Sequence, residues 1–228
     1  MHHIRPYRIF TLIETPPSER IASVQIPPRR AAGGVTLLET FVMVAALRVV
    51  AARRVFEFGT FLGSTTLNLA LNVSDDAEIF TLDLAENHAG TVNQHPADAE
   101  LTQIHLASQK RLDFLGSSVC GKIITLSGDS TKFDFSRWKD SIDLVFVDGG
   151  HDLATVKSDT ESALQMARKD RPSCILWHDY RNPNYGTSTS YLDELSQRLD
   201  IFHIEDTMLC AWFSDPAQSI RSHLLKRD

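Results

Sequence analysis

A strand, a glycine-containing turn and the start of a helix are predicted, in that order, by the stretch Val55-Phe56-Glu57-Phe58-Gly59-Thr60-Phe61-Leu62-Gly63-Ser64-Thr65-Thr66. Gly59 lets the chain turn tightly and lets a ligand approach the backbone, because glycine has no Cβ. Gly63 stands where the helix begins, and the hydroxyl of Ser64 is suited to capping its free N–H groups. Open α/β sheets bind ligands at the carboxyl ends of their strands, so we expect a ligand at this turn. A tight turn without a ligand is the alternative.

Short apolar segments alternate with amphipathic ones after this stretch. Leu153–Arg168 is the clearest helix, with its apolar residues on one face. Near the end of the chain, 202–205 and 207–213 are expected as two strands joined by a tight turn. Five other segments are almost continuously apolar, as strands buried on both faces of a parallel sheet are: Val55–Phe58, Ile79–Leu84, Ile123–Leu126, Ile142–Val147 and Cys174–Trp177. The alternation predicts an α/β fold with a doubly wound, Rossmann-like sheet.

The N-terminal residues differ from the rest. Two Pro-Pro pairs lie in residues 1–35, which we interpret as an extended arm preceding a domain over 36–228. Thr36 and Glu39 have the spacing of a capping box, and the helix behind them, about Thr36–Ala52, is apolar almost all round. A helix of that kind is usually buried.

The segment 85–118 is longer than one crossover needs, and we expect it to hold a helix near 99–114 that covers the site. Its three histidines, His88, His95 and His105, have spacings that match no common metal-ligand pattern.

Composition bounds the function. The chain has 228 residues, of which 43% are hydrophobic and 23% charged, with a formal net charge of −6. One domain with a sizeable core is expected, and the acidic balance argues against nucleic acid as a partner. The longest apolar run is too short and too interrupted to span a bilayer, no secretory signal is evident, and three distant cysteines indicate a reducing compartment. We therefore expect a cytoplasmic protein without a membrane partner, for which a homo-oligomeric state is left open.

Two further strand ends favour a nucleoside cofactor. Asp83 ends the strand after the glycine turn, where a carboxylate can accept the ribose hydroxyls, and Asp129 and Ser130 end the third strand near the adenine edge. Both NAD(P) and S-adenosylmethionine satisfy this pattern. A dinucleotide site needs G-x-G-x-x-G, but the central glycine is missing here, and an acidic Glu57 is unfavourable beside a pyrophosphate. The turn therefore favours S-adenosylmethionine, and a β-branched residue at Gly59 should push atoms into the cofactor space.

The fourth and fifth strands end in groups that can do chemistry. Asp148 is followed three residues later by His151, and the next strand ends at His178 and Asp179. These side chains should converge beside the methyl-donor end of the cofactor. Carboxylate oxygens suit Mg²⁺, which lowers the pKa of an acceptor hydroxyl, and His151, with an expected pKa near 6–7, would take its proton. The alternative is that the aspartates cap helices and that His178 is a packed polar residue.

These motifs carry a resemblance over about three quarters of the chain. They resemble a class I S-adenosylmethionine-dependent methyltransferase of methyltransferase family 24, which includes macrocin O-methyltransferase-like and cephalosporin-hydroxylase-like proteins. The matching stretches are Glu57-Phe-Gly-Thr-Phe-Leu-Gly-Ser-Thr, Thr81-Leu-Asp83, Gly128-Asp129-Ser130, Val145-Phe-Val-Asp148-Gly-Gly-His151 and His178-Asp179-Tyr180. The resemblance implies about seven strands in the order 3-2-1-4-5-7-6, with the last antiparallel, behind an N-terminal helical extension.

The expected activity is O-methylation of a hydroxyl on a small molecule, assisted by Mg²⁺ or another divalent cation. A non-catalytic cofactor-binding or regulatory module of the same fold is the main alternative, and a nicotinamide-dependent oxidoreductase a further one. We expect His151 as the catalytic base and Asp148, His178 and Asp179 as metal ligands. The expected cofactor-binding residues are Glu57, Gly59, Thr60, Phe61, Gly63, Ser64, Asp83, Asp129, Ser130 and Asp148.

Overall fold

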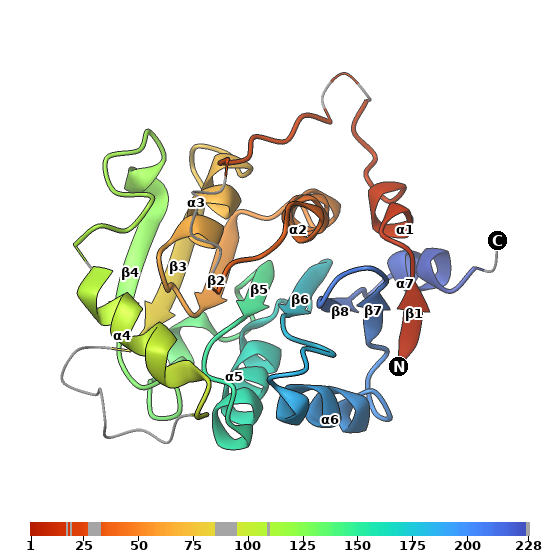
Figure 1. Cartoon of the computed structure of the whole chain (residues 1–228). Coiled ribbons are helices and arrows are strands. Elements are labelled where there is room, and N and C mark those ends of the chain that lie inside the picture. The colour runs from red at the N-terminus through yellow and green to blue at the C-terminus, as the bar shows by residue number, and fades with distance from the viewer. Residues whose placement is uncertain (17, 19, 27–32, 85–94, 109, 227–228) are drawn as a thin grey trace.

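A computed structural model describes residues 1–16, 18, 20–26, 33–84, 95–108 and 110–226 of the chain. Its strands form one sheet in the order β1-β7-β8-β6-β5-β2-β3-β4 (Figure 1). The strands are β1 (His2–Ile4), β2 (Arg54–Phe58), β3 (Glu78–Asp83), β4 (Ile123–Ser127), β5 (Leu144–Val147), β6 (Ser173–Trp177), β7 (Phe202–Ile204) and β8 (Cys210–Ser214). The order from β2 to β8 is the predicted one, and β8 is the antiparallel strand, pairing with β6 and β7.

The sheet has one strand more than predicted. Residues 2–4 were expected in an extended arm, and this is wrong, because β1 pairs in parallel with β7 at the edge of the sheet. The short helix α1 (Tyr7–Phe10) follows, and its Ile9 is fully buried. Hydrogen bonding along a free sheet edge and burial of one isoleucine together account for this docking.

Helices cover both faces of the sheet (Figure 1). On one face lie α2 and α3, with α1 and α7 beyond them, and on the other lie α5 and α6. Their bounds are α2 (Leu37–Val49), α3 (Ser64–Leu71), α4 (Asp98–Ser108), α5 (Leu153–Met166), α6 (Gly186–Leu195) and α7 (Ser219–Leu224), with 3₁₀ turns at Cys120–Lys122 and Ser136–Trp138.

Successive strand residues point into two different cores. Val55 of β2 joins the core beneath α2 and α3, whereas Phe56 joins the core beneath α5 and α6. The same alternation holds along β5, where Leu144 and Val145 divide in the same way. Burial on both faces is why these strands read as continuous apolar runs. β4 departs from that expectation, because it is the edge strand and Ile124 is exposed.

The capping box predicted at the start of α2 is present. The backbone N–H of Thr36 donates to Oε2 of Glu39 at 2.7 Å, and the Glu39 N–H donates to the Thr36 hydroxyl at 3.2 Å. Helix α4 begins one residue before the predicted helix at 99–114 and ends at Ser108. Residues 85–94 of the predicted crossover, with His88, lie outside the described residues.

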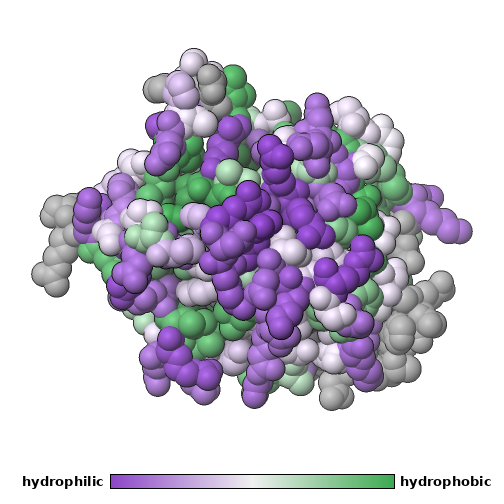
Figure 2. All heavy atoms as spheres, turned by 180° about the vertical axis from the view of Figure 1, so that it is seen from behind, coloured by the Kyte–Doolittle hydropathy of each residue, from purple (hydrophilic) through white to green (hydrophobic). Residues whose placement is uncertain are grey.

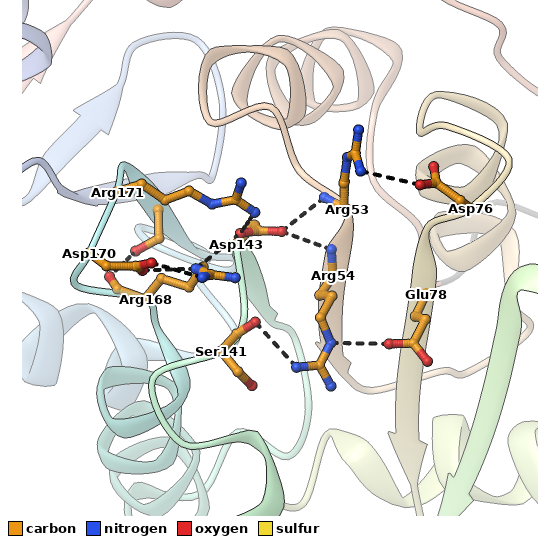
Figure 3. A network of polar contacts seen from close by, with 10 residues as sticks. Arg53, Arg54, Asp76, Glu78, Ser141, Asp143, Arg168, Asp170 and Arg171 are labelled. Atoms are coloured by element: carbon orange, nitrogen blue, oxygen red, sulfur yellow. Dashed lines mark hydrogen bonds and ion pairs between the residues drawn. The ribbon is translucent and has the colours of Figure 1, made fainter.

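A polar network joins β2, β5 and β6 at the amino ends of these strands, opposite the glycine turn (Figure 3). Asp143 is fully buried, and its Oδ2 accepts the backbone N–H groups of Arg53 and Arg54, both at 2.9 Å. Its Oδ1 accepts from the Arg171 guanidinium at 2.7 Å. A buried carboxylate satisfied in this way holds three strands together.

Figure 2 shows the back of the molecule as a mixture of hydrophilic and smaller hydrophobic regions. No helix in the described part of the chain is long and apolar enough to cross a membrane. All three cysteines are free; Cys174 and Cys210 are buried and Cys120 is half-buried.

Candidate active site

The glycine turn is packed against the end of β5. Gly59 has a φ of 92°, and a Cβ there would lie 2.0 Å from the carbonyl oxygen of Asp148. The expectation that a side chain at this position would invade the cofactor space is therefore corrected, since it would first collide with the protein's own backbone. Gly63, with a φ of 82°, caps α3 beneath the Phe114 ring, 2.7 Å from where its Cβ would be.

Asp83 connects β3 to the glycine turn. Its Oδ2 accepts the backbone N–H of Phe61 at 2.8 Å, and its Oδ1 accepts that of Leu84 at 2.7 Å. A carboxylate offers about four acceptor sites, so both oxygens keep capacity for further donors. The side chain is 22% exposed, which leaves it reachable by a ligand.

Glu57 lies inside the protein, below the turn. It is fully buried, and one oxygen accepts from the hydroxyls of Thr66 and of Thr81, the latter at 2.6 Å. Burial raises the pKa of Glu57 to about 8, although the two hydroxyls oppose the shift. Thr60 belongs to the same cluster, because its hydroxyl lies 2.7 Å from that of Thr81.

Three other predicted cofactor residues face polar groups of the protein: Ser64, Asp129 and Ser130. Ser64 donates its hydroxyl to Asp113. Asp129 is buried and accepts the Thr131 hydroxyl at 2.6 Å and the Lys132 ammonium at 2.9 Å. The Ser130 side chain lies near the buried Asp159, whose pKa is raised to about 7 mainly by burial. Ser64 follows the carboxyl end of β2, and Asp129 and Ser130 follow that of β4.

Three predicted metal ligands come together at the ends of β5 and β6. Nδ1 of His178 lies 3.3 Å from Oδ1 of Asp148 and 3.4 Å from Oδ2 of Asp179. One ligand atom from each of these residues lies within 4.8 Å of the others. Asp179 has a φ of 61°, a conformation rare for a residue with a side chain and costing about 1–3 kcal/mol.

Burial and the neighbouring groups together shift the pKa values of these three side chains. Burial raises the pKa of the Asp148 carboxyl, although the charge of His178 opposes the shift. Burial would also raise that of Asp179, but hydrogen bonds from His151 and His178 outweigh it and hold the pKa well below the usual range. The pKa of His178 is raised despite its burial, chiefly by the charge of Asp148.

His151 is held by carboxylates at both ring nitrogens. Nδ1 lies 2.8 Å from Oδ1 of Asp98, and Nε2 lies 2.6 Å from Oδ2 of Asp179. The ring also stacks on Tyr185, with centroids 3.7 Å apart. Burial lowers the pKa of His151, but the two carboxylates outweigh it and raise the pKa to about 10. The expected pKa near 6–7 is therefore wrong for this arrangement, because Asp98 was not foreseen.

Sequence reasoning missed four residues at the site. Asp98 and His105 both come from α4, and His105 contacts the carbonyl oxygen of Phe61 through Nδ1 at 2.8 Å. Helix α4 thus touches both the glycine turn and His151, as a cover over the site would. The other two are Tyr185, which stacks on His151, and Glu39, whose Oε1 lies 3.4 Å from Nε2 of His178. Their sequence signals were the helix predicted near 99–114, which holds His105 and begins one residue after Asp98, and the capping box of Glu39; neither indicated a role at the site.

The donor set suits a divalent cation. Four carboxylates, those of Glu39, Asp98, Asp148 and Asp179, surround two imidazoles, so negative groups outnumber positive ones even when both rings are protonated. Two carboxylates and one imidazole are ligands that Mg²⁺, Mn²⁺ and related ions accept. A small hollow of about 20 Å³ lies beside them, lined in part by Val147, Asp148, His151, Val156, Trp177, His178 and Leu192.

Comparison with known families gives one match. The model of a family described as a methyltransferase domain matches residues 56–180, from the glycine turn to the end of β6. No curated protein sequence matches the chain.

Solved structures share the fold at low sequence identity. The O-methyltransferase TomG from Streptomyces achromogenes, in complex with SAM, is 15% identical, with a TM-score of 0.55 over 80% of this chain and 82% of that one. An O-methyltransferase from Bacillus cereus in complex with SAH is 15% identical, with a TM-score of 0.52 over 80% and 82%. The SAH-bound methyltransferase PaMTH1 from Podospora anserina is 15% identical, with a TM-score of 0.51 over 93% and 89%.

Proposed function

This chain belongs to the methyltransferase-domain family, whose model spans more than half of its length, and we propose that it uses S-adenosylmethionine to methylate a hydroxyl oxygen on a small molecule with the help of a divalent cation. The observation that carries this proposal is the convergence of Asp148, His178 and Asp179 next to the glycine turn. A module that only bound the cofactor would not need that cluster.

The cofactor is proposed to lie across the ends of β2, β3 and β4. Asp83 would accept the ribose hydroxyls, because its carboxylate keeps free acceptor capacity and is partly exposed. Gly59 and Phe61 present the backbone there, and Asp129 and Ser130 border the adenine side. We propose that Glu57 supports the turn from inside through Thr66 and Thr81, since it is fully buried.

The metal is proposed to be held by Asp148, His178 and Asp179. A bound divalent cation would lower the pKa of an acceptor hydroxyl and orient it. The protein contributes a buried, negatively charged pocket whose ligands come from the ends of neighbouring strands.

His151 is proposed to receive the acceptor's proton. Asp98 binds Nδ1 and the backbone N–H of His151, which leaves Nε2 as the atom that faces the site. Asp179 now accepts from Nε2, and with carboxylates at both nitrogens the ring is protonated near neutral pH. The proposal therefore requires that Asp179 turn from Nε2 toward the cation, which would lower the pKa of the ring, so that an acceptor hydroxyl takes its place beside an unprotonated Nε2. The sulfonium is already an activated methyl donor, so positioning of the oxygen accounts for much of the remaining catalysis.

The acceptor is proposed to be a small molecule. The hollow beside His151 combines apolar walls with charged groups at one end, which is the kind of lining that small-molecule sites have. The free cysteines support a reducing compartment such as the cytoplasm as the place of action.

Two measurements test the proposal. Calorimetric titration should show binding of S-adenosylhomocysteine, and tight NADH binding without it would contradict the cofactor. Incubation with S-adenosylmethionine, Mg²⁺ and a panel of hydroxylated small molecules should release S-adenosylhomocysteine. In His151→Ala, turnover should fall about 10²–10⁴-fold with the cofactor affinity unchanged. Binding without turnover on any acceptor would favour the non-catalytic module.

A further inference from the structure

Glu39 makes more contacts than a helix cap requires. It lies in the first turn of α2 and is 1% exposed. Its Oε2 accepts the Thr36 N–H at 2.7 Å, which completes the capping box. Its Oε1 accepts the backbone N–H of Met208, in the connection between β7 and β8, at 2.8 Å and lies 3.4 Å from Nε2 of His178. One carboxylate therefore joins three parts of the chain.

The ring of His178 has a different neighbour at each nitrogen. Nδ1 faces Asp148 and Asp179, at 3.3 and 3.4 Å. Nε2 makes no conventional hydrogen bond within the described part of the chain, and the carboxylate it faces is Glu39. The side chain of His178 is 7% exposed, so the ring has little contact with water.

A negative charge at position 39 is not needed by the helix. A capping box works with glutamine as well as glutamate, because only an acceptor oxygen is required. Burying an ionised carboxylate is costly unless a partner compensates. The charged partner that Glu39 faces is His178, whose Nε2 lies 3.4 Å from Oε1. The same oxygen accepts the Met208 N–H, so the second oxygen of glutamate serves a backbone donor and also faces the imidazole.

We propose that Glu39 is the positioning residue of His178, holding Nε2–H so that Nδ1 is presented to a cation bound with Asp148 and Asp179. The inference rests on the proposed metal site of this chain. Histidines that bind metals almost always donate their other ring N–H to a carboxylate, a backbone carbonyl or water, which fixes the tautomer and raises the basicity of the ligating nitrogen. Here a helix on one face of the sheet would supply that acceptor to a ligand at the strand ends.

The test is Mn²⁺ binding to the full-length, cofactor-free protein, followed by electron paramagnetic resonance of the free ion. Glu39→Gln keeps the shape and an acceptor for the capping box, but it removes the charge and turns an NH₂ group toward His178 and the Met208 N–H. We expect it to bind Mn²⁺ about 10–100-fold more weakly than the wild type. Thr36→Ala is the matched control, because it breaks the same capping box without touching His178. It should lower Tm while its Mn²⁺ affinity stays within about twofold of wild type.

Each outcome decides a separate claim. Equal Mn²⁺ affinity in Glu39→Gln and wild type would overturn the inference and leave the metal site standing. Loss of affinity in Thr36→Ala as large as in Glu39→Gln would also overturn it, because the effect would then come from the helix end. A wild-type protein that binds no Mn²⁺ would remove the metal from the proposed function and this inference with it. If Glu39→Gln does not fold, Glu39→Asp replaces it, because aspartate keeps the charge but moves it one methylene away from His178. Its Mn²⁺ affinity is then compared with those of wild type and Thr36→Ala in the same way.

Discussion

The carboxylate of Asp98 binds His151 twice, accepting its backbone N–H at 3.0 Å and lying 2.8 Å from Nδ1, across 53 residues of sequence. The first residue of α4 thus fixes both the loop and the ring of the proposed base. Without Asp98, the ring keeps its contacts with Asp179 and Tyr185 but loses the partner that sets its tautomer.

Asp98→Ala should lower turnover with little change in S-adenosylhomocysteine affinity. Removing the orienting carboxylate of a serine-protease triad costs about 10⁴ in kcat, and we expect about 10²-fold here because two ring contacts remain. Steady-state kinetics and calorimetry measure the two quantities. Glu100→Ala is the control, since Glu100 is an exposed acid in the same turn of α4. A loss in Glu100→Ala equal to that in Asp98→Ala would assign the effect to the helix and not to His151.

The difference between what could and could not be predicted lies in the range of the contacts. Strands such as β2 and β5 are buried on both faces, so their apolar runs predict them directly, and the sheet order then brings Asp148 and Asp179 together. Asp98 lies beyond a long crossover of unpredictable path. The Glu39 capping box is a three-residue pattern, whereas its bond to Met208 spans 169 residues and leaves no local trace.

Gly59→Ala should destabilise the fold itself. Its Cβ would lie 2.0 Å from the Asp148 carbonyl oxygen, at a φ of 92° that disfavours side chains. We expect a loss of about 2–5 kcal/mol in the free energy of unfolding. Thermal or urea denaturation measures it, against Gly121→Ala, where nothing lies within 4 Å of the added Cβ. An unchanged Tm in Gly59→Ala would mean that the β2 and β5 loops do not pack as described.

Chelation should abolish methyl transfer. Dialysis against EDTA is expected to remove activity, and Mg²⁺ or Mn²⁺ to restore it, because Asp148, His178 and Asp179 form the proposed cation site. Asp148→Asn should lose activity to a similar extent and should not respond to added metal. Asp170→Asn changes an exposed residue before the amino end of β6, far from the proposed cation site, and should behave as wild type. Full activity in EDTA would eliminate the metal from the reaction.

Glu57 should make stability depend on pH. Its folded-state pKa, about 8, lies above the ordinary value of 4.5. The contribution of the protonated group is therefore fully present below about pH 4.5 and is lost as the pH rises through about 8. Glu57→Gln lacks this loss, so its free energy of unfolding should exceed that of wild type by about 3–5 kcal/mol at pH 9 and match it near pH 4.

Denaturation curves at both pH values test this difference. Glu161→Gln removes an exposed glutamate of α5 and should leave the pH dependence unchanged. A Glu57→Gln protein that parallels wild type at every pH would show that Glu57 is ionised in the folded state.

Asp143→Ala should destabilise the sheet at the amino ends of its strands. It removes a fully buried acceptor from two backbone N–H groups and from the Arg171 guanidinium. Breaking a buried charged network costs about 3–5 kcal/mol. Asp76→Ala, which breaks the exposed pair with Arg53, should leave the free energy of unfolding almost unchanged. Chemical denaturation distinguishes the two, and similar small losses in both variants would show that the Asp143 network does not stabilise the sheet.

The pairing of β1 with β7 determines how early the N-terminal strand can join the sheet during synthesis. His2 lies opposite Phe202 in the completed sheet, and Ile4 opposite Ile204. A ribosome adding about 5–20 residues per second takes about 10–40 s to travel that distance along the message. During that time the first strand has no edge on which to settle, while the strands that form the site are already emerging. The N-terminal strand therefore cannot pair with β7 until nearly the whole chain has been synthesised.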